Sequence, residues 1–390
     1  MKLGFYFSLF SLLVVSNLVA QTTEVDSSVI TEVVEVKKAE AYPKFKLGGV
    51  FQARYLANFK ENVDINGLNH SDGSGVSNSF EIKRMRVALN AQISENLELV
   101  TLVNLADFKS DPKTRVLENA FAKYTVNPYL QLQVGQFRPA FGIEDSHAVD
   151  IIKSIDWSNA YSLMGSNGWQ SFQIGVAASG KVNLNKIPLY YSFAITNGNG
   201  KNTTDNDDGK HYSGRLSFDL NPKNDFKVGI SSGIGDERKH SIYALGLDLT
   251  YKFNLAEKWS LDFQAEGFQA NNHVLYFNDL ANLEPTDPVN FHMNDYILRG
   301  FYVLPNLRYE IGKQRFQALE FSFRYEYLDA STKINSNPRQ TWIPMLSLEF
   351  LKNYGARLQV GMQIDNYKKN ISNTKMYNSN LAFVQFQCRL

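Results

Sequence analysis

The chain has 390 residues, one cysteine and a formal net charge of +1. The near-neutral charge argues against a nucleic-acid-binding protein, which carries a basic balance, and a single cysteine excludes an intramolecular disulfide framework. The six histidines are scattered without ligand spacing, and the chain has no nucleophile elbow or phosphate loop. We therefore expect no metal, no cofactor and no enzyme active site.

The N-terminus has the pattern of a secretory signal peptide over residues 1–20. Lys2 supplies the charged start, residues 3–15 are uncharged and mostly apolar, and Ala20 offers a small residue for cleavage. Residues 21–44 are polar and acidic, so we expect a flexible periplasmic segment there. No later apolar run is long enough for a transmembrane helix, which leaves residues 45–390 as the folded domain.

Residues 45–390 consist of short stretches that alternate apolar and polar side chains, separated by turn signals. In residues 318–327, for example, one face is aliphatic or aromatic and the other carries Glu320, Arg324 and Glu326. Three details favour a membrane barrel over a soluble sandwich. The stretches are about ten residues long, aromatic residues stand at the ends of the apolar faces, and the polar faces are charged.

Tight and long connections broadly alternate along this domain, as the periplasmic turns and outside loops of outer-membrane barrels do. Sixteen candidate strands lie near positions 45, 80, 97, 116, 130, 171, 189, 212, 226, 242, 259, 297, 315, 341, 356 and 381. An even number places both ends on the periplasmic side. The sequence thus predicts an all-β fold, a transmembrane antiparallel β-barrel of sixteen strands in an outer membrane.

Basic side chains gather in the first third of the chain. Arg84 and Arg86 share the polar face of one predicted strand, and Arg54 lies on the polar face of the preceding one. Arg138 follows the strand at 130–137, and Lys123 joins this group if it faces the lumen. Guanidinium groups bind phosphate and carboxylate through a planar fork of donors. The cluster either contacts anions in a pore or pairs with acidic residues and braces the barrel.

The C-terminal half has a different set of predicted inward charges. The acidic members outnumber the basic ones. The basic residues are Lys252, Arg308, Arg324 and Arg357, and the acidic residues are Asp248, Asp262, Glu266, Glu310, Glu320, Glu326, Glu349 and Asp365. A constriction between a basic wall and an acidic wall would carry a transverse electric field.

The stretch GQFRPAFGIE at 135–144 ends a predicted strand and precedes a long segment without clear periodicity, residues 147–169. Gly135, Pro139 and Gly142 interrupt the strand pattern there. We interpret them as the hinge of a constriction loop, with Arg138 at its entrance.

The chain resembles the phosphate-selective porin O and P family of Gram-negative outer-membrane porins. Three stretches carry the resemblance: FEIKRMRVALNA at 80–91, VGQFRPAFGIE at 134–144, and GFYVLPNLRYEI followed by FSFRYEYLD. The resemblance implies a homotrimer in outer-membrane lipid, a third loop folded into the lumen, and passive diffusion of small anions, with phosphate or polyphosphate as the named substrates. It also implies anion contacts at Arg54, Arg84, Arg86 and Arg138.

Two departures from the family pattern bear on the substrate. The inward run of Arg and Lys is shorter than in the best-known members, and residues 172–175 lack the Arg that often precedes the glycine of that strand. Phosphate selectivity therefore does not follow from the resemblance. Alternative hypotheses are a general porin, a porin for oligosaccharides or organic acids that uses inward aromatic residues such as Tyr190 and Phe268, and a surface-binding barrel that acts through its long loops.

Overall fold

The computed structural model describes residues 41–109, 112–284, 286 and 288–390. The predicted signal peptide and most of the predicted flexible segment at 21–44 lie outside these residues. The compact unit is Tyr42–Leu390. No helix within the described residues is long and apolar enough to cross a membrane.

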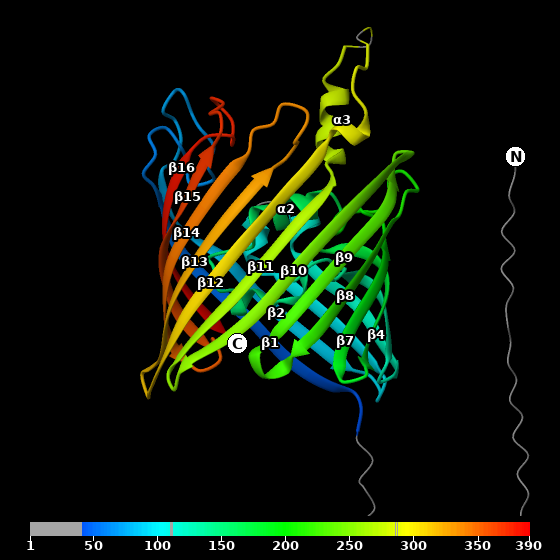
Figure 1. Cartoon of the computed structure of the whole chain (residues 1–390), viewed down its shortest axis with the longest axis vertical. Coiled ribbons are helices and arrows are strands. Elements are labelled where there is room, and N and C mark those ends of the chain that lie inside the picture. Colours follow the sequence, from blue (N-terminus) through cyan, green and yellow to red (C-terminus); the bar gives the residue numbers. More distant parts are fainter. Residues whose placement is uncertain (1–40, 110–111, 285, 287) are drawn as a thin grey trace, which may run out of the picture. The chain divides into compact units, whose positions relative to one another are not determined.

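Sixteen antiparallel strands close into a barrel, which confirms the predicted fold class and strand number (Figure 1). Every strand pairs with its sequence neighbours, and β1 pairs with β16, so the sheet has no open edge. The strands are β1 (Lys44–Asn58), β2 (Asn78–Gln92), β3 (Leu97–Asn104), β4 (Leu117–Asn127), β5 (Leu130–Phe137), β6 (Gln173–Leu184), β7 (Ile187–Thr196), β8 (His211–Asn221), β9 (Phe226–Glu237), β10 (His240–Ala256), β11 (Trp259–Asn271), β12 (Ile297–Lys313), β13 (Phe316–Asp329), β14 (Arg339–Leu351), β15 (Ala356–Tyr367) and β16 (Ser379–Arg389).

Short turns join the strands at one end of the barrel, and mostly long loops join them at the other (Figure 1). We number the loops at the second end in chain order, so the third loop is residues 138–172 and the sixth is residues 272–296. Short helices lie in the loops and in one turn: η1 (Leu105–Lys109), α1 (Pro112–Arg115), η2 (Glu144–Ser146), η3 (Val149–Ile151), α2 (Asn159–Ser166), η4 (Pro222–Asn224), α3 (His273–Ala281) and η5 (Met293–Asp295).

The fifth loop, between β9 and β10, breaks this pattern, because it consists only of Arg238 and Lys239. Both residues have a positive φ, the conformation of a tight type I′ hairpin. The rim of the barrel therefore carries no long loop between its fourth and sixth loops.

The two faces of the strands have opposite chemistry. On β10, Leu245 and Leu247 are 50% and 59% exposed, while Ala244 and Asp248 on the other face are buried. Because successive strand residues point to opposite faces, the exposed apolar side chains form the outer surface and the buried polar ones the inner surface. In a membrane, this apolar outer surface contacts lipid.

An apolar core fills part of the barrel interior between the third loop, the sixth loop and strands β10 to β12. Its members come from all three parts: Phe141, Ala160, Met164, Trp169, Ile242, Ala244, Phe268, Ala270, Tyr276, Met293, Tyr296 and Leu298. At the long-loop end, this core leaves the β1 to β4 side of the interior as the side where polar side chains can line open space.

A charge on the outer face of β10 tests this orientation. Leu247→Arg places a guanidinium near the middle of a spanning strand, and we expect it to lower the free energy of unfolding by about 2–4 kcal/mol. Leu247→Phe, which keeps the face apolar, is the control and should be tolerated. Urea titrations of the protein folded in lipid vesicles measure both, and equal stability of the two variants would contradict the orientation.

Candidate functional site

The third loop is bonded to side chains on strands all around the barrel. The backbone N–H of Ile143 donates to Glu266 on β11 at 2.6 Å, and that of Asn159 donates to Glu326 on β13 at 2.8 Å. Further contacts reach β2, β9, β15 and β16, through Arg84–Asp156, Ser231–Gly142, Arg357–Ile152 and Gln387–Asp150. These strands are spread over most of the circumference, so the loop is tied to opposite sides of the barrel.

Two of the three predicted hinge residues have backbone conformations that favour glycine. Gly142 has φ +83°, and a Cβ there would lie 2.2 Å from Glu266 Oε1. Gly135, inside β5, has φ +125°, and a Cβ there would lie 2.2 Å from the carbonyl oxygen of Ala120. Pro139 precedes Ala140, which also has a positive φ of 52°. The chain thus changes direction between Gly135 and Gly142.

Buried carboxyl groups hold the loop to itself. Glu144 accepts hydrogen bonds from the backbone N–H and the hydroxyl of Ser158, at 2.9 and 2.5 Å. Asp145 accepts from the Tyr161 hydroxyl at 3.0 Å and the Ser171 N–H at 3.1 Å. Burial raises the pKa of Asp145 to about 7, against the lowering effect of nearby Arg138. Burial also raises the pKa of Glu144.

A cavity of about 370 Å³, the outer cavity, lies at the long-loop end on the β1 to β4 side. Residues of the first, second and fourth loops line it, together with β1, β2 and the third loop. Its charged lining is mostly basic, with eight Lys or Arg side chains against three carboxylates: Arg54, Lys83, Arg84, Arg86, Lys109, Arg115, Arg138 and Lys201 against Glu81, Asp107 and Glu118. The structure thus brings four of the five predicted basic residues together.

Three of these arginines form ion pairs within the protein. Arg54 on β1 pairs with Glu81 on the neighbouring strand β2 at 2.6 Å, and Arg86 on β2 pairs across β3 with Glu118 on β4 at 2.6 Å. Arg84 pairs with a carboxylate of the third loop. These arginines therefore brace the barrel while they also line a cavity with excess positive charge.

Arg138 and Lys123 have different surroundings. The Arg138 guanidinium donates to the backbone carbonyl of His147 at 2.8 Å, and its carbon lies 5.4 Å from the ring centre of Trp157. It lines the outer cavity while it fixes the start of the third loop. Lys123 pairs with Glu98 of β3 at 2.5 Å and does not line the outer cavity.

Lys83 is a basic lining residue that strict strand alternation misses. The pairing of β1 with β2 shifts register beside Gln52, whose partner is Arg84, while the next residue, Ala53, pairs with Ile82. This β-bulge leaves Lys83 without a partner on β1, so Lys83 and Arg84 both line the outer cavity. Strand alternation also misses Lys201, because this residue lies in the fourth loop, where no periodic signal predicts that it lines the cavity.

Asp156 of the third loop lies among the basic side chains of β2. Its carboxylate is 2.6 Å from Arg84 and 3.0 Å from Lys83. Burial opposes its ionisation, but the two cations hold the pKa of Asp156 well below its usual range. Asp156 is thus a fixed anion bound by this basic wall.

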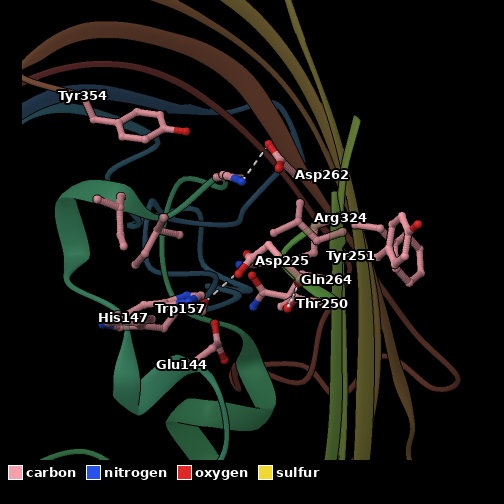
Figure 2. A pocket seen from close by; sticks show the side chains of 15 residues that line it. Glu144, His147, Trp157, Asp225, Thr250, Tyr251, Asp262, Gln264, Arg324 and Tyr354 are labelled. Carbon is pink, nitrogen blue, oxygen red and sulfur yellow. Dashed lines mark hydrogen bonds and ion pairs between the residues drawn. The ribbon is translucent and has the colours of Figure 1, made fainter. Parts of the chain in front are cut away.

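A second cavity of about 220 Å³, the inner cavity, reaches toward the short-turn end, where Asp225 and Tyr354 line it (Figure 2). Its charges are mixed, because Glu144, Asp225 and Asp262 face Lys153 and Arg324. Burial lowers the pKa of His147, another lining residue, to about 4, which leaves its imidazole neutral at pH 7. The inner cavity therefore lacks the positive excess of the outer one.

Much of the predicted acidic wall is paired with basic side chains. Asp248 pairs with Arg215, Glu320 and Glu349 both pair with Arg308, and Asp365 pairs with Arg339. The remaining inward acids bond to the third loop: Asp262 through Lys153, Glu266 through Ile143 and Glu326 through Asn159, whereas Glu310 pairs with Arg308 and is exposed. The acidic wall therefore anchors the loop or forms ion pairs within the protein, and three of its carboxylates share the single guanidinium of Arg308.

The two aromatic residues proposed for sugar stacking lie outside both cavities. Phe268 is buried in the interior core beside Phe141, and the Lys181 ammonium lies 5.0 Å from the ring centre of Tyr190. Within the described part of the chain, no three His, Cys, Asp or Glu side chains are arranged to hold a metal ion.

Comparisons with known proteins agree with the resemblance seen in the sequence. The model of the family phosphate-selective porin O and P matches residues 57–233. No curated protein matches the chain. Among solved structures, the outer-membrane channel DcaP of Acinetobacter baumannii is 12% identical with a TM-score of 0.55, over 90% of this chain and 99% of that one. The trimer form of in-vitro folded OmpT of Vibrio cholerae is 9% identical with a TM-score of 0.52, over 90% and 100%.

The hinge is tested by Gly142→Ala against Gly200→Ala. Gly200 has φ +85°, close to that of Gly142, but a Cβ there meets nothing within 4 Å. Both substitutions should cost about 1–2 kcal/mol for the left-handed conformation, and only Gly142→Ala adds the contact with Glu266. We expect faster proteolysis of the third loop in Gly142→Ala alone. Equal cleavage of both variants would contradict the hinge.

The raised pKa of Asp145 predicts a pH dependence of stability. The protonated carboxyl is favoured in the folded state, so its contribution is complete below the ordinary pKa of 3.8 and is lost as pH rises through about 7. Thermal midpoints measured from pH 5 to 8.5 should fall less steeply in Asp145→Asn, whose amide stays neutral. Glu144 titrates in both proteins, so some slope remains. Identical slopes would refute the assignment.

Proposed function

We propose that this chain, whose residues 57–233 match the model of the phosphate-selective porin O and P family, is an outer-membrane β-barrel channel of a Gram-negative bacterium that passes small anions by passive diffusion. The barrel fold and the family match point to a channel rather than an enzyme. The proposal goes further in naming the charge of the solute, and the basic outer cavity is the observation that carries it.

The outer cavity would concentrate anions at the entrance from outside the cell. Its basic side chains exceed its carboxylates even after Arg54, Arg84 and Arg86 are paired. Excess positive charge in a low-dielectric cleft raises the local anion concentration and lowers that of cations. Rings of Arg and Lys favour anions in a pore in the same way.

The interior core supports a route along the basic wall. Apolar side chains of the third and sixth loops fill the interior against β10 to β12. A hydrated solute avoids such a core, because apolar groups offer nothing to replace its hydrogen bonds with water. At the long-loop end of the barrel, the β1 to β4 side, with its charged lining, is the side left for transport.

The pairing of the arginines favours passage over tight binding. The guanidinium groups of Arg54, Arg84 and Arg86 already bond to carboxylates, so a passing anion would have to share these donors. Conduction requires binding that is weak enough for release. Phosphate, polyphosphate and small organic acids carry oxygens that accept hydrogen bonds from guanidinium groups. The family name favours phosphate among them.

Our second candidate function is a general porin without phosphate preference. The mixed charge of the inner cavity favours it, because a solute that has passed the basic cavity meets no further positive excess there. Comparing reversal potentials in phosphate, chloride and benzoate separates the two candidates. A phosphate porin should favour phosphate over the smaller chloride, whereas a general porin should rank the three ions by size.

We propose that the chain assembles as a homotrimer in outer-membrane lipid. Strands β3 and β5 have eight residues each, while β10 and β12 have seventeen. An eight-residue strand, tilted as in barrels, spans less than the roughly 25 Å apolar band of an outer membrane, so the short side is better covered by protein. OmpT of Vibrio cholerae, a barrel of the same fold, has a trimer form.

Selectivity should depend on the cavity lysines. Lys83→Gln combined with Lys201→Gln removes two positive charges but leaves Asp156 paired with Arg84 and Glu118 paired with Arg86. We expect the ratio of anion to cation permeability in planar bilayers to fall roughly twofold or more, because the cavity's positive excess shrinks. The control, Lys186→Gln with Lys352→Gln, makes the same charge change on exposed short turns. Equal ratios in both double variants would refute the proposal.

A further inference from the structure

The outer and inner cavities share one lining residue, Trp157 of the third loop. Among the described residues, every other lining residue belongs to only one of the two cavities. In Figure 2 the Trp157 side chain lies beside His147 on the loop side of the inner cavity, across from Thr250 and Gln264 on the strands. The residue therefore lies at the boundary between the two spaces.

The backbone beside this tryptophan is held from two sides of the barrel. On one side, the Asp156 carboxylate binds Arg84 and Lys83 of β2 and accepts a hydrogen bond from the Trp157 N–H at 3.0 Å. On the other side, the Arg324 guanidinium of β13 donates to the carbonyl oxygens of Asp156 and Trp157, at 2.6 and 3.1 Å. Residues 156 and 157 thus form a strap that joins β2 to β13 through the interior.

Ring contacts and apolar packing hold the indole ring, whereas ion pairs and hydrogen bonds hold the backbone. Its centroid lies 5.0 Å from that of the Tyr161 ring, and the Arg138 guanidinium lies 5.4 Å from its centre. The side chain is only partly buried, and it packs at the edge of a small core of Val50, Val149 and Ile152. A ring with two side-chain torsions can therefore move while its backbone stays in place.

We propose that the Trp157 ring is the partition between the two cavities and sets the size limit of the channel. The inference rests on the proposed function, because it takes the lumen as the path of the solute. With the ring in place, the two cavities are separate spaces of about 370 and 220 Å³. Rotation of the ring away from the strap joins them into one passage. The basic residues select by charge, and the tryptophan selects by size.

Single-channel conductance tests this role directly. Trp157→Ala should raise conductance in KCl about twofold or more, because a narrow constriction dominates the resistance of a pore. Trp157→Phe, which keeps a smaller ring, should give a smaller rise. The matched control is Trp342→Ala, since Trp342 faces outward on β14, where it lies 5.6 Å from the Tyr325 ring. Conductance of Trp157→Ala equal to that of the wild type would overturn the proposal.

A second measurement tests the partition even if the Trp157→Ala variant fails to fold. Cys388 is the only cysteine, so W157C combined with C388S carries one thiol, at the boundary of the cavities. Bulky methanethiosulfonate reagents should block its current from either side of the bilayer, and C388S alone should be unaffected. Reaction that leaves the current unchanged would count against a partition at this position.

The outcomes separate the partition from the proposed function. Liposome swelling with neutral sugars of increasing size reports the size limit without reference to charge. A raised size limit in Trp157→Ala supports the partition even if the wild-type channel prefers cations, a result that would reject the anion proposal alone. An unchanged size limit rejects the partition and leaves anion selectivity standing.

Discussion

The structure depends on the need of the third loop for hydrogen-bond partners. A loop that leaves regular structure among the inward side chains of a barrel must satisfy its backbone N–H and C=O groups there. Inward charged residues meet this need: Glu266 and Glu326 accept from loop amides, and Arg324 donates to loop carbonyls. Many of the charged residues that the sequence assigns to a pore lining thus hold the loop in place.

This requirement explains the unequal charge of the two cavities. The acids of β10 to β15 bond to arginines or to the loop, so their charge is used within the protein. On β2, one loop carboxylate, Asp156, faces both Lys83 and Arg84. Basic residues from the second, third and fourth loops add to this side. The positive excess of the outer cavity is what remains after the loop has been anchored.

Much of the fold could be predicted from the sequence, because period-two alternation depends only on which face of a strand meets lipid. The alternation located all sixteen strands and assigned Arg54, Arg84 and Arg86 to the inner face. The partners of Arg84 and Arg86 could not be predicted, since Asp156 lies in the third loop and Glu118 lies two strands away from β2.

Other parts of the site lie beyond periodic reasoning. The β-bulge at Lys83 reverses the facing of the residues before it, so strict alternation fails at that point. Lys201 and Trp157 come from loops, whose course depends on tertiary contacts that no local pattern encodes. The glycine signal at Gly142 could be found in the sequence, but its reason, the close approach of Glu266, could not.

The most direct test of the central claim is the reversal potential of the wild-type channel across a KCl gradient in a planar bilayer. A channel whose charge selection comes from the basic outer cavity should give a reversal potential shifted toward the equilibrium potential of chloride. High salt should reduce this shift, because it screens the basic side chains. A reversal potential on the potassium side, or none at any salt concentration, would contradict the account.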